Sequence, residues 1–171
     1  MKSDYESRAR KFAHILITLF AGCVDLNDFV FAIQEYNATH SRPLVYAHGV
    51  SRIAIIRSDY VIKFNIRPSG FWKDGRAGSI SSEARVYEQA VADGMEHLLA
   101  KVTVDKENDR IFAIMPRIRN IGNESRNWYN YCTYEESEWL ESHINDLHEN
   151  NVGYRNGKVC VIDYAWEAWE A

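Results

Sequence analysis

The polar residues Asp146, His148, Asn151 and Asp163 lie close together near the end of the sequence, and an apolar run precedes the last of them. A carboxylate can take the proton of a hydroxyl group, and a carboxylate with an amide oxygen can bind a magnesium ion. We therefore interpret Asp146 as a candidate general base, and Asn151 and Asp163 as candidate magnesium ligands. The segment GYRNGKV between these ligands is typical of a tight hairpin, which would bring both to one place.

The length and composition of the chain limit the kind of fold that carries these residues and the partners that it can bind. A chain of 171 residues fits one domain with two lobes, and a hydrophobic share of 46% beside a charged share of 26% indicates a soluble globular fold. The formal net charge of -4 does not favour nucleic acid as a partner.

The cysteines and the apolar N-terminal segment indicate a cytoplasmic protein. Cys23, Cys132 and Cys160 show no paired spacing, which favours reduced thiols over disulfides or a zinc site. The apolar run at residues 11–23 looks like part of a secretion signal, but acidic residues precede it and its periodicity is helical. It is too short to span a bilayer, so we expect a helix that packs on the domain and no membrane association.

Two helices are predicted at the N-terminus. The first covers residues 4–21 and stops at Gly22, and the second runs from a cap at Asp25 to about Tyr36. The residues expected on the buried faces are Phe12, Ile15, Leu16, Leu19, Phe20 and Cys23 in the first helix, and Phe29, Val30 and Ile33 in the second.

Strands follow these helices. Three are predicted at residues 44–48, 53–56 and 60–66, then a helix over 79–94 capped by Ser81 or Ser82, then a hairpin within 98–115. We interpret residues 119–132 as a linker and residues 133–144 as a short helix, whose Thr133 and Glu136 have the spacing of a capping box. The chain is therefore predicted to be α+β, with five strands and one helix inserted after the third.

This order of elements, together with two motifs, resembles the protein-kinase-like superfamily. The segments DLHENN (146–151) and VIDYA (161–165) resemble its catalytic loop and its metal-binding aspartate. They are most similar to the versions found in aminoglycoside phosphotransferases and in small serine/threonine kinases encoded by bacteriophages. The resemblance implies a minimal bilobal fold: a five-stranded antiparallel N-lobe sheet with one αC-type helix, an N-terminal helical pair and a truncated C-lobe.

The resemblance also implies a division of the chain and an adenine site. It implies a helical extension at residues 1–37, an N-lobe at 44–118 and a truncated C-lobe at 119–171, all within one structural domain. The fifth strand would lead into the hinge, where backbone groups from Met115 to Arg117 would bind the adenine of ATP.

Further site residues are implied by the same resemblance. Lys63 would hold the α- and β-phosphates, and Glu83 would pair with it, with Glu88 as the alternative. Gly49 and Val50 would cover the phosphates. Asp146 would act on the acceptor hydroxyl, and Asn151 and Asp163 would bind Mg²⁺, so the implied cofactors are ATP and Mg²⁺.

The sequence departs from the kinase pattern in several places. The glycine-rich loop retains only Gly49, Ile144 stands where the motif has a histidine, and Tyr164 and Ala165 replace the usual Phe-Gly after the aspartate. The C-lobe is short, and we expect the N-terminal helices or a second copy of the chain, in a homodimer, to brace the fold. His148 either orients the acceptor or hydrogen-bonds within its own loop, and we favour the second role.

Three functions are compatible with these residues. We expect a serine/threonine protein kinase, acting on host proteins in the host cytoplasm if the chain is phage-encoded. One alternative is an aminoglycoside-phosphotransferase-like kinase that phosphorylates a small-molecule hydroxyl group. The other is a catalytically weak kinase-like protein that binds a nucleotide or a partner.

Overall fold

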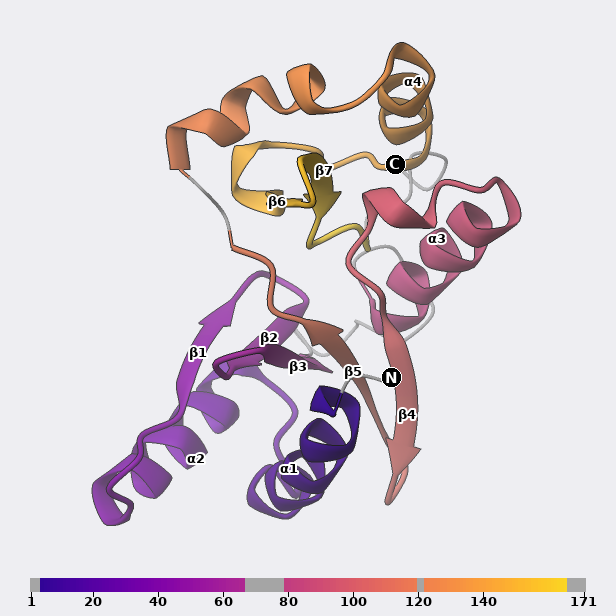
Figure 1. Ribbon diagram of the computed structural model, residues 1–171. Helices are drawn as coiled ribbons and strands as arrows, with labels where there is room; N and C mark the ends of the chain where they lie inside the picture. The colour runs from indigo at the N-terminus through magenta and orange to yellow at the C-terminus, as the bar shows by residue number, and fades with distance from the viewer. Residues whose placement is uncertain (1–3, 67–78, 120–121, 166–171) are drawn as a thin grey trace. The chain divides into compact units, whose positions relative to one another are not determined.

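A computed structural model describes residues 4–66, 79–119 and 122–165, apart from the side chains of residues 122–126. These residues form four α-helices, a five-stranded antiparallel sheet and a two-stranded sheet (Figure 1). The fold is α+β, as predicted, and it contains the predicted five-stranded antiparallel sheet.

The chain divides into two compact units. Unit 1 consists of residues 1–74 and 103–117, and unit 2 consists of residues 75–102 and 118–171. These units cut across the expected N-lobe at 44–118, because residues 75–102 group with the C-terminal part of the chain. The division into functional domains stays a prediction.

Unit 1 contains the larger sheet, in the order β1-β2-β3-β5-β4 with every neighbouring pair antiparallel. Its strands are β1 (Val45–His48), β2 (Arg52–Ile56), β3 (Tyr60–Asn65), β4 (Thr103–Glu107) and β5 (Arg110–Pro116). Asn108 and Asp109 join β4 to β5 with positive φ angles of 49° and 61°, the geometry that suits a two-residue hairpin turn. The five predicted strands and their antiparallel arrangement in one sheet are confirmed.

The core of unit 1 lies on one face of this sheet. Ile53 pairs with Phe64, which pairs with Phe112, and residues two apart along a strand share a face. The helices α1 (Tyr5–Leu19) and α2 (Leu26–Thr39) contribute to the same core cluster. The ring centroid of Phe20 lies 4.9 Å from that of Phe29 and 5.4 Å from that of Phe64, so aromatic packing joins both helices to the sheet.

The two N-terminal helices differ from the prediction in detail. Asp25 caps α2 as expected, in a reciprocal capping box with Asp28, but α2 continues to Thr39. The prediction that Ile15 is buried is wrong, because 51% of its surface is exposed. The buried face of α1 is formed by Ala9, Ala13, Leu16 and Ile17, and Ile15 lies outside this stripe.

Unit 2 contains two α-helices, three 3₁₀ segments and a hairpin in its described residues. They are α3 (Ile80–Ala92), η1 (Glu96–Leu98), η2 (Gly122–Tyr131), α4 (Tyr134–His143), η3 (Glu149–Asn151), β6 (Val152–Arg155) and β7 (Lys158–Val161). The Ala100 amide donates to the Val161 carbonyl over 2.9 Å, which connects the segment after η1 to β7.

Two predictions for unit 2 need correction. The cap of α3 is Ser79, whose hydroxyl accepts the amide hydrogen of Ser82 over 3.0 Å, so Ser81 and Ser82 already lie inside the helix. Most of the expected linker is the 3₁₀ segment η2, which is kinked at Asn127. The predicted capping box of Thr133 and Glu136 is confirmed at the start of α4.

The three cysteines all lie in the part of the chain that the structure describes. Cys23, Cys132 and Cys160 are free thiols, and burial raises the pKa of Cys160 to about 11. Across residues 4–66, 79–119 and 122–165, no helix has both the length and the apolar character that crossing a membrane requires.

Candidate functional site

The loop between α4 and β6 carries the candidate catalytic residues. Ile144 is buried at its start, whereas 53% of the Asp146 side chain is exposed. Nδ1 of His148 lies 3.2 Å from the Asn150 amide nitrogen, and the His148 carbonyl accepts the amide hydrogen of Asn151 over 2.9 Å. The loop therefore turns tightly after His148 and leaves the Asp146 carboxylate accessible to an acceptor.

The side chain of Asn151 contacts two residues that precede it in the loop, Asp146 and His148. Its side-chain Nδ2 lies 2.8 Å from the Asp146 carbonyl oxygen and 3.0 Å from Nε2 of His148. The residue is buried, with 7% of its surface exposed. These contacts turn the amide nitrogen toward the loop, so the oxygen, the atom that could bind a cation, points in a different direction within the same amide plane.

The hairpin predicted from GYRNGKV is confirmed. Asn156 and Gly157 form its two-residue turn, with positive φ angles of 54° and 77°. At the open end of the hairpin the Ile162 amide donates to the Asn151 carbonyl over 2.8 Å. Asn151 and the residue before Asp163 are therefore direct neighbours across the two strands, as the magnesium site requires.

The segment after Asp163 is anchored to α3. The Tyr164 amide donates to Oε1 of Glu83 over 3.4 Å, and the Ser82 hydroxyl donates to the Ala165 carbonyl. Glu83 is fully buried, whereas Glu88 is exposed. Glu83, and not its alternative, is therefore the α3 carboxylate that reaches the neighbourhood of Asp163.

Tyr164 strengthens this anchor. Its side chain is fully buried, and its hydroxyl donates to the Ala100 carbonyl. The tyrosine thus occupies a closed site in the core of unit 2, where a buried hydroxyl needs a partner. The sequence showed only that this residue replaces the usual phenylalanine.

Gly153 is required for close packing behind the hairpin, and we did not anticipate it. A Cβ atom at this position would lie 2.5 Å from the carbonyl oxygen of Arg119 and 2.7 Å from the side chain of Ile118. The glycine therefore lets β6 approach the segment that follows β5. In the sequence, the only indication of this role was that the glycine lies two residues after Asn151.

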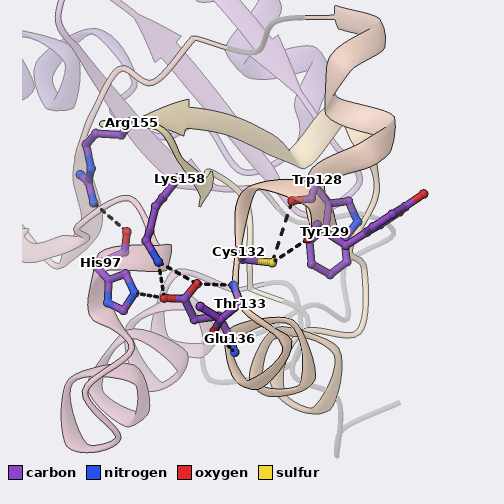
Figure 2. A network of polar contacts seen from close by, with 8 residues as sticks. All are labelled: His97, Trp128, Tyr129, Cys132, Thr133, Glu136, Arg155 and Lys158. Carbon is purple, nitrogen blue, oxygen red and sulfur yellow. Dashed lines mark hydrogen bonds and ion pairs between the residues drawn. The ribbon is translucent and has the colours of Figure 1, made fainter.

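A buried carboxylate holds the elements on either side of the loop together (Figure 2). Glu136 of α4 accepts hydrogen bonds from Lys158 of β7 over 2.7 Å and from the Thr133 amide over 2.8 Å, and it lies 2.9 Å from Nε2 of His97. Burial by itself would raise the pKa of Glu136, but the hydrogen bonds from Lys158, Thr133 and His97 outweigh it and lower the pKa to about 2. Since α4 precedes the loop and the hairpin follows it, this network fixes both ends of the loop.

A second cation contributes to the same network. Nη2 of Arg155, at the end of β6, donates to the carbonyl oxygens of His97 and Leu99, each over 3.3 Å. The hairpin is therefore held to η1 by Arg155 and to α4 by Lys158. The capping-box spacing identified Glu136 in the sequence, but nothing local indicated its partners from other elements.

The remaining candidate residues lie in unit 1. Lys63 is buried, with 8% of its surface exposed, and it stands opposite Ala54 on β2 and Ala113 on β5. These three residues face away from the core, because their neighbours Ile62 and Phe64 point into it. The two alanines leave space beside the lysine stem on this face of the sheet.

The expected phosphate loop is the turn between β1 and β2. Gly49 is exposed, as is Val50, with 73% of its surface accessible, and a Cβ atom added to Gly49 would meet no other residue within 4 Å. The Gly49 amide donates to the Arg52 carbonyl over 3.0 Å, so this donor closes the turn. The phosphate-binding roles of Gly49 and Val50 stay predictions.

The expected adenine-binding segment is largely engaged within unit 1. Met115 is buried and pairs with Val61. Arg117 donates its amide to the Asp59 carbonyl over 3.0 Å and its guanidinium to the Arg57 carbonyl over 3.1 Å. A role of Met115 or Arg117 in binding adenine stays a prediction, and for Arg117 it would fall to the carbonyl group.

The oxygen donors fit the preference of magnesium, which binds one or two carboxylates together with phosphate oxygens. Among the described residues, no three His, Cys, Asp or Glu side chains gather as a metal site of their own. The candidate set is smaller: the amide oxygen of Asn151 and the half-buried carboxylate of Asp163.

Comparisons with known proteins give only distant matches. No protein-family model and no curated protein matches the chain. Among solved structures, it is similar to a co-crystal structure of WbdD with the kinase inhibitor LY294002, and to a medium-resolution structure of the bifunctional kinase-methyltransferase WbdD. Both are 14% identical over 74% of this chain, with TM-scores of 0.38 and 0.39. The match covers 33% and 34% of those chains, so this chain spans about a third of their length.

Proposed function

We propose that the chain is an ATP- and magnesium-dependent phosphotransferase, and specifically a minimal serine/threonine protein kinase. The observation that carries this proposal is the hairpin that brings Asn151 next to the residue before Asp163, while Asn151 also holds the Asp146 backbone. A base and two oxygen ligands thus belong to one continuous segment, in the order that the kinase-like motifs have.

In the proposed reaction the acceptor hydroxyl oxygen attacks the γ-phosphorus of ATP, and the bond to the β–γ bridging oxygen breaks to release ADP. Asp146 accepts the hydroxyl proton and later passes it to solvent. Asn151 and Asp163 would hold Mg²⁺, which neutralises charge on the phosphates when it is bound. Lys63 would bind the α- and β-phosphates, with Glu83 as its partner.

The structure also supports the anchoring of the metal-binding segment. Glu83 binds the Tyr164 amide and Ser82 binds the Ala165 carbonyl, so the backbone after Asp163 is held on both sides of Tyr164. A fixed backbone limits the positions of the Asp163 carboxylate, and preorganised charges are the main source of catalysis in phosphoryl transfer.

One observation favours a second candidate, the kinase-like binding protein without strong catalysis. The turn at Gly49 has one glycine, and the amide of that glycine is used within the turn. Fewer backbone donors at the phosphates would weaken alignment of ATP more than its binding. The type of acceptor, the phage origin, a homodimer and the cytoplasmic location all stay predictions.

The test is transfer of ³²P from [γ-³²P]ATP with Mg²⁺, for the wild type and Asp146→Asn, each alone and in a bacterial lysate. Loss of a general base lowers transfer by roughly 10²- to 10⁴-fold, so labelled protein bands should disappear in the variant. Asp109→Asn is the matched control, because Asp109 lies in the exposed turn between β4 and β5.

The outcomes separate the candidate functions. Label that enters small molecules and not proteins would replace the protein kinase by a small-molecule kinase. Magnesium-dependent ATP binding without transfer would favour the binding protein. Equal transfer by the wild type and Asp146→Asn would contradict the assignment of the base.

A further inference from the structure

We infer that His148 is a positioning residue that orients the Asn151 amide beside the Asp146 carboxylate, an inference that rests on the proposed function. The sequence favoured a purely local role for this histidine. In the structure Nδ1 lies 3.2 Å from the Asn150 amide nitrogen, within the same loop, but the second ring nitrogen, Nε2, faces the two candidate site residues.

The contacts of Nε2 carry the inference. This atom lies 3.0 Å from Nδ2 of Asn151 and 3.7 Å from Oδ1 of Asp146. The side chain of His148 is 42% exposed, so the ring stands between the buried amide and the exposed carboxylate and does not belong to the core. The residue thus contacts the candidate metal ligand and lies beside the candidate base.

The chemistry of a neutral imidazole decides which of its two nitrogens can accept a hydrogen bond, from Asn150 or from Asn151. The ring has one hydrogen and one in-plane lone pair, so each nitrogen either donates or accepts. With the lone pair on Nε2, the ring accepts from Asn151 and turns the amide oxygen outward. With the hydrogen on Nε2, the ring accepts from Asn150 through Nδ1 and cannot accept from Asn151, so the two contacts exclude each other and we assign the lone pair to Nε2.

Two substitutions distinguish the contributions of the two ring nitrogens. In His148→Asn the side-chain oxygen can stand where Nδ1 stands, so it can accept the Asn150 amide hydrogen, and the group at Nε2 is lost. In His148→Gln the longer side chain places its amide near the position of Nε2, so the reverse holds. If His148 positions the site, glutamine should replace it well and asparagine poorly.

The kinetic test compares His148→Gln, His148→Asn and His148→Ala with the wild type by kcat and by KM for ATP. Loss of a residue that orients a metal ligand costs roughly 10- to 100-fold. We expect that loss in kcat for the Asn and Ala variants, with little change in KM, and near wild-type kcat for Gln. A kcat of His148→Asn equal to or higher than that of His148→Gln would overturn the inference, because a histidine that only caps the turn predicts that order.

A second readout does not require activity. In ¹H–¹⁵N spectra the Asn151 side-chain amide, assigned with Asn151→Asp, should exchange its hydrogens slowly in the wild type and in His148→Gln, and faster in His148→Asn. The Asn150 backbone amide should show the opposite order, which confirms that the variants separate the two nitrogens. Identical Asn151 exchange in all variants would refute the inference, whereas absent phosphate transfer with the expected exchange would refute only the proposed function.

Discussion

Glu136 should make the folded protein sensitive to acid in a defined pH range. Its pKa is lowered from 4.5 to about 2, and each pKa unit corresponds to about 1.4 kcal/mol, so the ionised carboxylate contributes about 3 kcal/mol to the free energy of unfolding. Only 9% of the Glu136 side chain is exposed, so solvent screens its interactions weakly.

The sign of the pH effect follows from the lowered pKa. Above about pH 4.5 the carboxylate is ionised in both states and the full contribution is present. Between pH 4.5 and 2 the unfolded chain binds the proton first, so the contribution falls, to about half at pH 3, and it is lost below the folded pKa.

The assay is urea unfolding of the wild type and Glu136→Gln from pH 2 to pH 7, followed by tryptophan fluorescence. The two proteins should differ by about 3 kcal/mol at pH 7 and by little at pH 2. Glu141→Gln, an exposed change on the same helix, should lie within about 0.5 kcal/mol of the wild type at each pH. A difference that stays constant over this range would refute the assignment of the lowered pKa to Glu136.

Two further predictions concern packing around the loop. Gly153→Ala should lower the free energy of unfolding by about 1–3 kcal/mol in urea titrations, because its Cβ would overlap the Arg119 carbonyl, while Gly49→Ala should change it little; equal effects would contradict the close approach. Tyr164→Phe should cost about 1–2 kcal/mol in the same titration, because it leaves the buried Ala100 carbonyl without its donor; an unchanged midpoint would show that the hydroxyl is not needed there.

Features specified by neighbouring residues could be predicted from the sequence. The caps at Asp25 and Thr133 depend on side chains that reach amides three residues away, and the Asn156–Gly157 turn depends on backbone preferences at two positions. The proximity of Asn151 to the residue before Asp163 belongs to the same class, because one hairpin joins these two positions. The positions of the five strands along the chain could also be predicted, whereas their order within the sheet was not.

Features that depend on residues far apart in the chain could not be predicted from the sequence. Glu136 was visible as a cap, but its partners Lys158 and His97 come from other elements. The burial of Glu83 and the anchoring of Tyr164 depend on the packing of α3 against the segment after β7. Ile15 was misplaced because several apolar stripes fit the same helix, and only the packed sheet selects one of them.

The hairpin β6–β7 makes the spacing of the two candidate ligands a matter of strand register. One residue inserted in the turn would shift the pairing and move the side chain of Asp163 to the opposite face, with no change in either ligand. A hairpin of this kind closes in about 1–10 μs, much faster than sheets built from distant segments. The ligand pair can therefore form, and be gained or lost in evolution, as one short segment of chain, without any change in the sheet that carries Lys63.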